Sequence, residues 1–512
     1  MARGRWGRAG LSIAVAVLSV AGCAADDSAD SSGASGGASG SVGSDSVGSD
    51  SGQAPSSLDP YAIADRVQIE AVTAHLSELE RIADENEGNR ALGTPGYDAS
   101  VDYVAGRLRD AGFDVQTPEF DVTGFDVETE TLDIDGTAVS VRALGFSPST
   151  GPDGLTVRPV RVPSDETPGC EPTDYDGLDV AGSAVLVDRG ACTFSVKEQV
   201  AADRGAAAVL VVNNEDGPLS GAGLAEDEKP RIPVGGLARQ DADTVAGASS
   251  VKLTLDTTTE RQSSRNVIAE TSTGAADNVV VVGAHLDSVP EGPGINDNGT
   301  GVASVLETAL QLGAEPDVAN KVRFAFWGAE EVGLVGSARY VDGLSDDERR
   351  NIALYLNFDM LGSPNPGYLV FDGDDSDGEG EGPGPEGSAG IERTFAQFFA
   401  ERGITVSGTD FDGRSDYGPF VAVGIPAGGV FSGADDEKTA EQAELWGGTG
   451  GEAFDPNYHT AEDDVANVDR AALAAAAASV GYGTAFYALS VDGPDGVPVG
   501  DARVQAREAF TE

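Results

Sequence analysis

The residue types best suited to metal chemistry occur where three apolar runs end in the second half of the chain. They are His285 and Asp287 after residues 279–283, Glu330 and Glu331 after residues 322–327, and Asp359 after residues 353–357. Apolar strands alternate there with helical stretches, a pattern typical of an α/β sheet. Because ligand sites in open α/β sheets lie beyond the carboxyl ends of the strands, we expect these side chains to share one crevice. The loop 294–299, which precedes a predicted helix over 302–312, adds Asp297.

Histidine is scarce, so its placement is informative. The chain has three histidines, His75, His285 and His459, and the last two stand beside acidic residues and loop glycines. Imidazole nitrogen and carboxylate oxygen are the ligands expected for catalytic zinc in a site without thiolates. Taken alone, however, His285 and Asp287 at a strand end fit a hydrogen-bonded turn better. His75 lies within a predicted helix, and we expect it to be a surface or packing residue.

Crowding of the carboxylates changes this balance. The acids that would lie together are Asp297, Glu330, Glu331 and Asp359. Like charges this close disfavour shared ionisation unless cations neutralise them. Two divalent metal ions, about 3.5 to 4 Å apart, would supply that neutralisation and would lower the pKa of a shared water. A carboxylate that is not a ligand could then accept the proton of that water, so the sequence predicts a two-metal hydrolytic site.

Five ordered segments resemble the secreted bacterial leucyl aminopeptidases with co-catalytic zinc, in a broader family that includes aminopeptidase Y. The segments are His285-Leu286-Asp287, Ile295-Asn296-Asp297-Asn298-Gly299, Ala329-Glu330-Glu331, Asn357-Phe358-Asp359-Met360 and Tyr458-His459. The resemblance runs from about residue 62 to residue 490. It implies a zinc exopeptidase fold of the phosphorylase/hydrolase-like type, with two zinc ions per chain. The implied substrates are peptides with a free N-terminus and an apolar, leucine-like first residue.

The resemblance also implies how the metal ions are held. Asp297 would bridge the two ions. His285 and Asp359 would complete the ligands of one ion, and Glu331 and His459 those of the other.

Further roles are implied for residues that are not ligands. Glu330 would act as the general base and later as the acid. Asp287 would orient His285 and raise its basicity, and Tyr458 would donate to the developing oxyanion. Arg414 matches a family segment that helps line the substrate cleft. An ion pair with Asp416 is the equally weighted alternative for Arg414.

Charge favours an aminopeptidase over an endopeptidase, because the free α-ammonium of a substrate needs anionic partners, which Glu330 and Asp359 could supply. The chain also departs from the family pattern. Tyr417 stands where many relatives carry a histidine, and no cysteine pair surrounds His459, which predicts a less braced loop. One alternative function is that of a glutaminyl cyclase, an acyltransferase on a related fold with one zinc ion. Another is a binding protein that has lost catalysis.

Residues 126–262 change to short β-rich segments, such as 183–187 and 207–212, and we interpret them as an inserted domain. Residues 179–194 resemble a protease-associated domain. Such domains carry no chemistry of their own, and by analogy this one would shape the access of substrates to the active site. Cys170 and Cys192 form a pair once Cys23 is set aside. An oxidising compartment favours a disulfide between them, and the resemblance implies the same pairing. A free reactive thiol is the alternative.

The N-terminus predicts export. Arg3, Arg5 and Arg8 precede the apolar run 11–20, which has the length of a signal-peptide core and is too short to span a bilayer as a stable helix. Residues 20–23 resemble a bacterial lipobox, so that Cys23 would be lipidated and would anchor a cell-surface lipoprotein. Ordinary cleavage and free secretion is the rival interpretation. Residues 24–57 then form a disordered, flexible tether.

Composition bounds the remaining expectations. With 86 Asp and Glu against 32 Lys and Arg, the net charge of -54 excludes a nucleic-acid partner. A chain of 512 residues favours two globular units, and we expect a monomer. The predicted fold is α/β, with a mixed central β-sheet flanked by helices and an inserted β-rich domain. The predicted divisions are the signal peptide (1–22), tether (24–57), first peptidase part (58–125), insert (126–262), catalytic part (263–490) and a frayed tail (491–512).

Two local expectations complete the analysis. Helices are predicted over residues 62–84 and 97–110, separated by a break at Gly93-Thr94-Pro95-Gly96. Residues 372–390 are rich in Gly, Asp and Glu, and we expect a mobile loop there, with calcium binding as the less favoured alternative.

Overall fold

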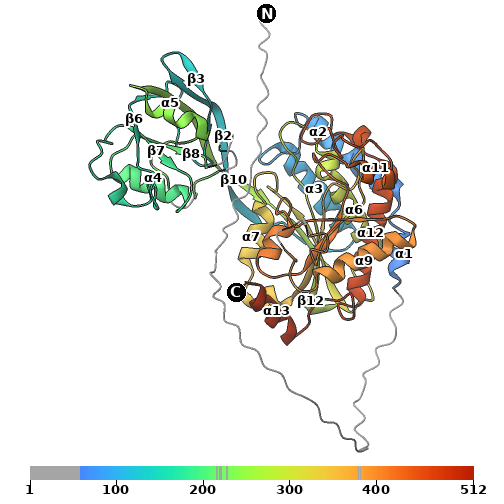
Figure 1. Cartoon of the computed structure of the whole chain (residues 1–512). Helices are drawn as coiled ribbons and strands as arrows, with labels where there is room; N and C mark the ends of the chain where they lie inside the picture. Colours follow the sequence, from blue (N-terminus) through green and yellow to red (C-terminus); the bar gives the residue numbers. More distant parts are fainter. Residues whose placement is uncertain are drawn as a thin grey trace, which may run out of the picture.

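The computed structural model describes residues 58–511, apart from 215, 216, 218, 220, 221, 226–228, 379 and 381. The predicted signal peptide, the lipobox with Cys23 and the tether lie outside the described residues. The described chain forms two lobes, joined by the long strands β2 (Glu119–Ile134) and β10 (Val251–Arg265) (Figure 1). The larger lobe combines the segment before β2 with the chain after β10.

A mixed β-sheet forms the centre of the larger lobe. Its order among the described residues is β1-β11-β13-β12-β14-β17-β15-β16. The strands are β1 (Asp114–Gln116), β11 (Val267–Glu270), β13 (Asn320–Trp327), β12 (Ala275–His285), β14 (Ile352–Phe358), β17 (Ala427–Phe431), β15 (Leu369–Phe371) and β16 (Ser407–Thr409). Strands β13, β12, β14 and β17 run parallel, whereas β1, β11 and β15 introduce antiparallel pairs. The predicted α/β fold class with a mixed sheet is confirmed.

Side-chain alternation along β12 explains why helices cover both sheet faces. Val280 and Val282 belong to one buried cluster, and Val279 and Val281 to another, because successive strand side chains point to opposite faces. The first cluster includes residues of α2 (Ile69–Glu85), α3 (Pro95–Asp110), α6 (Thr300–Leu312), α9 (Ser388–Glu401) and α12 (Arg470–Leu489). The second includes residues of α7 (Val335–Gly343) and α10 (Tyr417–Ala422). A strand buried on both faces reads as a continuous apolar run, as residues 279–283 do.

Helix α12 is long and apolar enough to span a membrane by length and composition, yet 72% of its apolar window is buried inside the protein. Its burial in the main core cluster accounts for that composition.

The helix predicted over residues 62–84 is divided in the structure. The chain forms α1 (Pro60–Ala64) and α2, with a turn between them. Ala64 and Val67 both face Gly481 of α12, where a side chain would find little room. Packing against this glycine therefore outweighs the helical spacing of the sequence. The predicted second helix is α3, and Thr94 caps its first turn by accepting a hydrogen bond from the amide of Tyr97.

The smaller lobe is built on the ribbon of β2 and β10. Strands β3 (Thr137–Val139) and β5 (Leu155–Val157) flank the ribbon, and a second sheet has the order β4-β9-β8-β7-β6. Its strands are β4 (Val141–Ala143), β9 (Val234–Leu237), β8 (Ala208–Val212), β7 (Ala184–Asp188) and β6 (Pro159–Arg161). Helices α4 (Phe194–Asp203) and α5 (Ala242–Ala246) complete the lobe, and Cys170 and Cys192 form a disulfide. The predicted strands at 183–187 and 207–212 correspond to β7 and β8.

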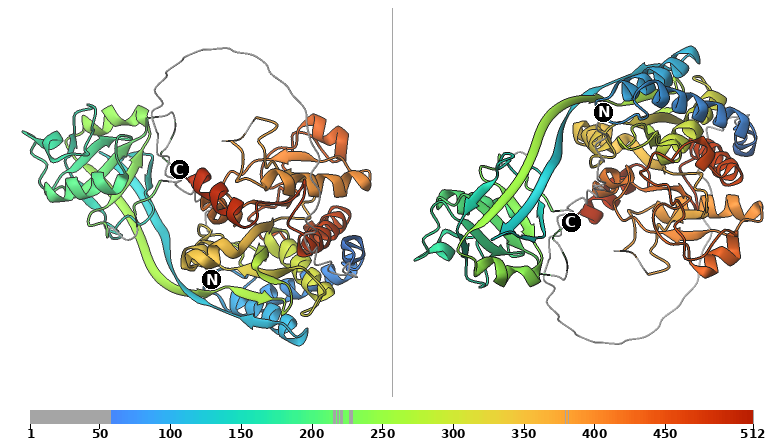
Figure 2. Two further views of the ribbon diagram at one scale, coloured as in Figure 1. Left: turned by 90° about the horizontal axis from the view of Figure 1, so that it is seen from below. Right: turned by 90° about the horizontal axis from the view of Figure 1, so that it is seen from above.

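The ribbon makes the boundary between the lobes gradual. β2 and β10 pair antiparallel along nearly their whole length, and both run from one lobe into the other (Figure 2). The limits predicted at residues 126 and 262 fall inside these two strands, so the division at these limits remains a proposal.

The expectation of a frayed tail over residues 491–512 is wrong for its last part. Residues Asp501–Thr511 form α13, and its two arginines are buried. Arg503 donates to the carbonyls of Asp277 and Arg350 at 3.0 and 2.9 Å. Arg507 donates to the carbonyls of Arg349 and Ile352 at 2.5 and 2.6 Å. These carbonyls lie near the start of β12, in the helix Asp346–Asn351 and at the first residue of β14. Helix α13 therefore covers the end of the sheet opposite the carboxyl ends of the strands.

Replacing Arg503 by Ala should reduce the free energy of unfolding by roughly 2 to 4 kcal/mol, because buried carbonyls lose a charged donor. Chemical denaturation of the purified protein measures this change. Glu508→Ala, at an exposed position of the same helix, is the control and should leave the midpoint nearly unchanged. A midpoint for Arg503→Ala equal to that of the control would show that α13 does not stabilise the sheet.

Candidate metal centre

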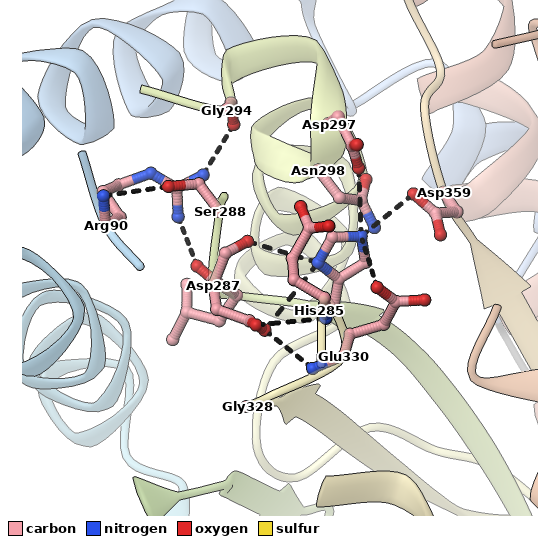
Figure 3. Close-up of polar contacts among 12 residues, drawn as sticks. Arg90, His285, Asp287, Ser288, Gly294, Asp297, Asn298, Gly328, Glu330 and Asp359 are labelled. Carbon is pink, nitrogen blue, oxygen red and sulfur yellow. Dashed lines mark hydrogen bonds and ion pairs between the residues drawn. The ribbon is translucent and has the colours of Figure 1, made fainter. Parts of the chain in front are cut away.

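The carboxyl ends of the parallel strands bring together the side chains predicted from the sequence. His285 ends β12, Asp359 follows β14, and Glu330 and Glu331 lie in the turn after β13. Asp297 lies in the turn Ile295–Gly299, directly before α6 (Figure 3). His459 is contributed by a loop much later in the chain.

Two groups of potential ligands share one residue. His285, Asp297 and Asp359 offer atoms within 4.8 Å of one another, and so do Asp297, Glu331 and His459. His285 Nε2 lies 3.1 Å from Asp297 Oδ1 and 3.3 Å from Asp359 Oδ1. His459 Nε2 lies 3.1 Å from Asp297 Oδ2 and 3.0 Å from Glu331 Oε2. The two oxygens of Asp297 therefore face different histidines.

Several of these atoms are buried without the hydrogen bonds that buried polar atoms normally make. Glu331 Oε1 has no hydrogen-bond partner, and neither Asp359 Oδ1 nor His459 Nε2 makes a contact with hydrogen-bond geometry, although each lies 3.0 to 3.3 Å from an oppositely charged group. Such orphaned atoms call for an explanation, and a bound ion is one that suits converging imidazole and carboxylate groups. The donor set, nitrogen and oxygen without thiolate, fits zinc. The residues present therefore fit a metal centre.

The pKa values in this cluster show that burial makes it costly to ionise these acids together. Burial raises the pKa of Glu331 to about 7, and the charge of Asp297 acts in the same direction. Burial also raises the pKa of Glu330 well above its ordinary value. Burial alone would lower the pKa of His459, but the carboxylates of Asp297 and Glu331 raise it to about 10. A cluster of this kind needs positive charge, as protons or as cations.

Asp287 acts through different atoms from those expected. His285 Nδ1 lies 3.2 Å from the main-chain carbonyl of Asp287 and 3.9 Å from its carboxylate. The carboxylate instead accepts the amide hydrogens of Glu330 and Glu331, at 3.1 and 3.3 Å. Asp287 therefore orients the histidine with its backbone and holds the Glu330–Glu331 turn with its side chain.

Arg90 is a residue of the site that sequence reasoning missed. Its side chain is fully buried and donates to the carbonyls of Leu286, Pro293 and Gly294, the last two at 2.9 and 2.6 Å. Its amide donates to Ser288 Oγ at 2.9 Å (Figure 3). One guanidinium thus ties the end of β12 to the turn that carries Asp297. The only available signal was a lone cation in a loop, which is too common to identify a site.

Two further residues beside Asp359 were also missed. Ser415 donates to Asp359 Oδ2 at 2.6 Å and accepts from Asn357 at 2.8 Å, which fixes the carboxylate on its strand end. Asp416 is fully buried, its carboxylate oxygens have no hydrogen-bond partner, and burial raises its pKa to about 7. Both residues stand beside Arg414 in the segment 413–420, in which the sequence singles out Arg414 as a candidate cleft residue and Tyr417 as a departure from the family pattern.

A cavity opens onto the candidate ligands. His285, Asp297, Glu330, Asp359, Arg414 and Tyr458 line it together with the less polar Met360, Phe371, Tyr417, Phe431 and Ala434. Arg414 pairs with Asp435 at 3.0 Å, so the alternative ion pair with Asp416 is wrong. The Arg414 guanidinium lies 6.0 Å from the centre of the Tyr458 ring. Thr409, Asp410, Asp412, Ser415 and Asp436 also line the cavity, which therefore combines candidate metal ligands, one cation, further acids and several apolar residues.

Residues outside the centre bear on two other expectations. His75 is buried, 2.6 Å from the Tyr103 hydroxyl and 3.2 Å from Glu307, so it is a packing residue and not a surface one. In the loop 372–390, Asp372 accepts the amides of Asp374, Ser376 and Asp377. The acidic groups that gather there are Asp372, Asp374 and Glu392, and Asp375, Asp377 and Asp410. Calcium binding at these groups stays a prediction.

The chain is similar to known peptidases in both sequence and structure. The chain matches peptidase family M28 over residues 266–483 and a PA domain over residues 155–245. An aminopeptidase from Aneurinibacillus sp. strain AM-1 has a similar structure, with a TM-score of 0.64 and 26% identity over 86% of this chain and 99% of that one. A zinc aminopeptidase from Bacillus subtilis gives a TM-score of 0.54 at 26% identity over 85% of this chain and 99% of its own.

Two relatives compared by sequence are more similar to this chain than these two structures, each of which is 26% identical to it. The chain is 41% identical to an aminopeptidase of Pseudomonas aeruginosa over 84% of this chain and 83% of that protein. It is 54% identical to the probable lipoprotein aminopeptidase LpqL of Mycobacterium tuberculosis, over 86% of this chain and 88% of that protein. With the metal-ligand arrangement at the strand ends and this identity across nearly the whole described chain, the protein belongs to peptidase family M28.

Proposed function

We propose that this metallo-aminopeptidase is exported and hydrolyses the N-terminal residue from peptides, with a preference for apolar, leucine-like residues, using two zinc ions. The observation that carries the proposal is the position of Asp297, whose two carboxylate oxygens face His285 and His459 beside the buried Glu330. We assign the bridge between the ions to Asp297. His285 and Asp359 would hold one ion, and Glu331 and His459 the other.

Glu330 is the proposed general base. When bound, the zinc ions would polarise the scissile carbonyl and lower the pKa of the attacking water. Glu330 lies at the cavity wall with Oε2 4.0 Å from His285 Nε2, and Asp287 holds its backbone in place. Its carboxylate would take the proton of the water and return it to the departing amine. A pKa above the ordinary value suits a group that must both accept and donate a proton.

The substrate would be oriented by charge and by the apolar residues of the cavity. The free α-ammonium would pair with Glu330 and Asp359, partners that the neutral amide of an internal residue cannot use. Tyr458, which lines the same cavity, would donate its hydroxyl to the developing oxyanion. Arg414 would contact the substrate from the rim. Met360, Phe371 and the neighbouring aromatic residues would accept an apolar first side chain.

The proposed location follows from the N-terminal signals and from the insert. The Cys170–Cys192 disulfide suits an oxidising compartment outside the cytosol. The lipobox at residues 20–23 would place a lipid anchor on Cys23, and the Mycobacterium tuberculosis relative is itself named a lipoprotein. We therefore favour a lipoprotein anchored at the cell surface over a freely secreted enzyme. We further propose a monomer, with a calcium ion at the loop 372–390 as the less favoured alternative to a loop without bound metal.

Replacing Glu330 by Gln should slow peptide hydrolysis by about 10²-fold to 10⁴-fold, because the amide cannot accept the proton of the water. Zinc content should stay at the wild-type level, since Glu330 is not an assigned ligand. Steady-state kinetics with an aminoacyl anilide and elemental analysis measure both quantities. Full turnover in this variant would refute the role of Glu330.

Replacing Asp297 by Ala should lower the zinc content for both ions, because each loses the shared carboxylate. The measurement is elemental analysis after gel filtration in metal-free buffer. The control is Asp84→Ala, at an exposed position of α2, which removes the same charge from the protein surface. Zinc content equal to that of the control would show that Asp297 does not bridge the ions.

The decisive experiment for the function compares aminoacyl anilides with their N-acetylated forms. Free leucyl anilide should be hydrolysed and the N-acetylated form should not, because acetylation removes the positive charge that Glu330 and Asp359 would bind. A chelator should abolish the activity, and added zinc should restore it. Hydrolysis of both forms at similar rates would contradict exopeptidase action. Formation of pyroglutamate from glutaminyl peptides without release of amino acids would instead indicate a glutaminyl cyclase.

A further inference from the structure

The loop of residues 455–463, which carries His459 and which we call the His459 loop, has little regular structure of its own. His459 has a φ of +57°, in the left-handed region that residues with a side chain rarely adopt. Its side chain is 31% exposed, which makes it the most exposed of the five candidate ligands. Such a histidine needs support from its surroundings to stay aligned with Asp297, and no cysteine pair surrounds it in this chain.

The support comes from two buried carboxylates, one at each end of the His459 loop. Asp455 and Asp463 each have only 1% of their surface exposed. The two oxygens of Asp463 accept the amide hydrogens of Asn296 and Asp297, at 2.8 and 3.0 Å. Its main-chain carbonyl accepts the amide of Ile295 at 3.0 Å. One residue therefore fixes three successive amides in the turn that carries Asp297.

Asp455 makes the matching contact at the other end of the loop. Its Oδ2 accepts the side-chain amide of Asn296 at 2.6 Å, and its Oδ1 accepts the amide of Asn457 at 2.9 Å. Asn467 links the two acids, because its side-chain amide lies 3.0 Å from Asp455 and 3.3 Å from Asp463. Both ends of the His459 loop are thus bonded to the same short turn.

Close packing of the loop provides an independent observation. A Cβ atom at Gly292 would overlap the carbonyl group of Thr460 and approach Ala461, so the backbone after His459 lies directly on this glycine. Gly292 belongs to the same segment, 286–294, whose carbonyls Arg90 binds. The His459 loop is therefore pressed against the segment between His285 and Asp297 as well as bonded to it.

We propose that Asp455 and Asp463 are positioning residues that set His459 at the correct distance from Asp297, and so determine the affinity for the zinc ion held by Asp297, Glu331 and His459. The proposal rests on the proposed function, because it takes the five-residue ligand set as a zinc site. It predicts that damage to this network weakens the ion held by His459 more than the other, because Asp297 serves both ions whereas the His459 loop supplies a ligand to only one of them.

The test is a zinc titration of Asp463→Asn against a metal indicator, with the wild type in parallel. Asn can accept only one of the two amide hydrogens through its carbonyl oxygen. We expect one of the two dissociation constants to rise by about 10-fold to 100-fold, the effect typical of losing a partner that orients a ligand, with a smaller change in the other constant. Glu462→Gln, at an exposed position of the same loop, removes the same charge and should leave both constants unchanged.

Two further variants keep the test decisive if Asp463→Asn folds poorly. Asn467→Ala removes the shared donor, and Gly292→Ala pushes the loop away by steric overlap; both should weaken the same ion. Excess zinc should restore the thermal stability and turnover of each variant, which a purely structural defect would not allow. Unchanged constants for both ions in all three variants, whatever their stability, would overturn the proposal. Wild-type protein that binds no zinc would instead overturn the proposed function.

Discussion

Mutual repulsion among buried acids around Asp297 is the constraint on which the rest of this structure depends. Asp297 is 5% exposed and shares its surroundings with Glu330, Glu331 and Asp359. Carboxylates that lie so close together and are shielded from water are costly to ionise unless positive charge and donated hydrogen bonds compensate them. The two histidines provide part of that compensation. Backbone amides of the turns that carry Glu330, Glu331 and Asp297 donate to the neighbouring buried carboxylates of Asp287 and Asp463. A pair of dications completes it in the function we propose.

The sheet explains how so many acids can be brought to one point. Parallel strands end at a common edge, so β12, β13 and β14 deliver His285, the Glu330–Glu331 turn and Asp359 to neighbouring positions. These positions could be predicted from the sequence, because a strand buried on both faces is an apolar run whose end is easily found. The resemblance of five ordered segments to a known family supplied His459, which no spacing rule connects to the strands.

Residues that act through the backbone could not be predicted. Arg90 bonds to carbonyls, and Asp463 bonds to amides, so neither interaction leaves a mark in the residue types of its partners. Asp416 stands next to an assigned residue, but only its burial distinguishes it. Tertiary packing also overruled local pattern at the ends of the chain. The predicted first helix is interrupted where Ala64 and Val67 pack against Gly481. The segment that was expected to be frayed forms a helix held by its buried arginines.

Arg90 also joins two parts of the chain that the inserted lobe separates in the sequence. Arg90 precedes the inserted lobe, whereas its partners Leu286, Pro293 and Gly294 follow it. β1 and β11 also pair across the insertion, and the insert leaves and returns through the single ribbon of β2 and β10. Contacts that do not involve the smaller lobe therefore hold the larger lobe together at the candidate metal centre. An insertion attached in this way can change in size or shape without moving His285 or Asp297, because the ligand positions are fixed on the near side of the ribbon.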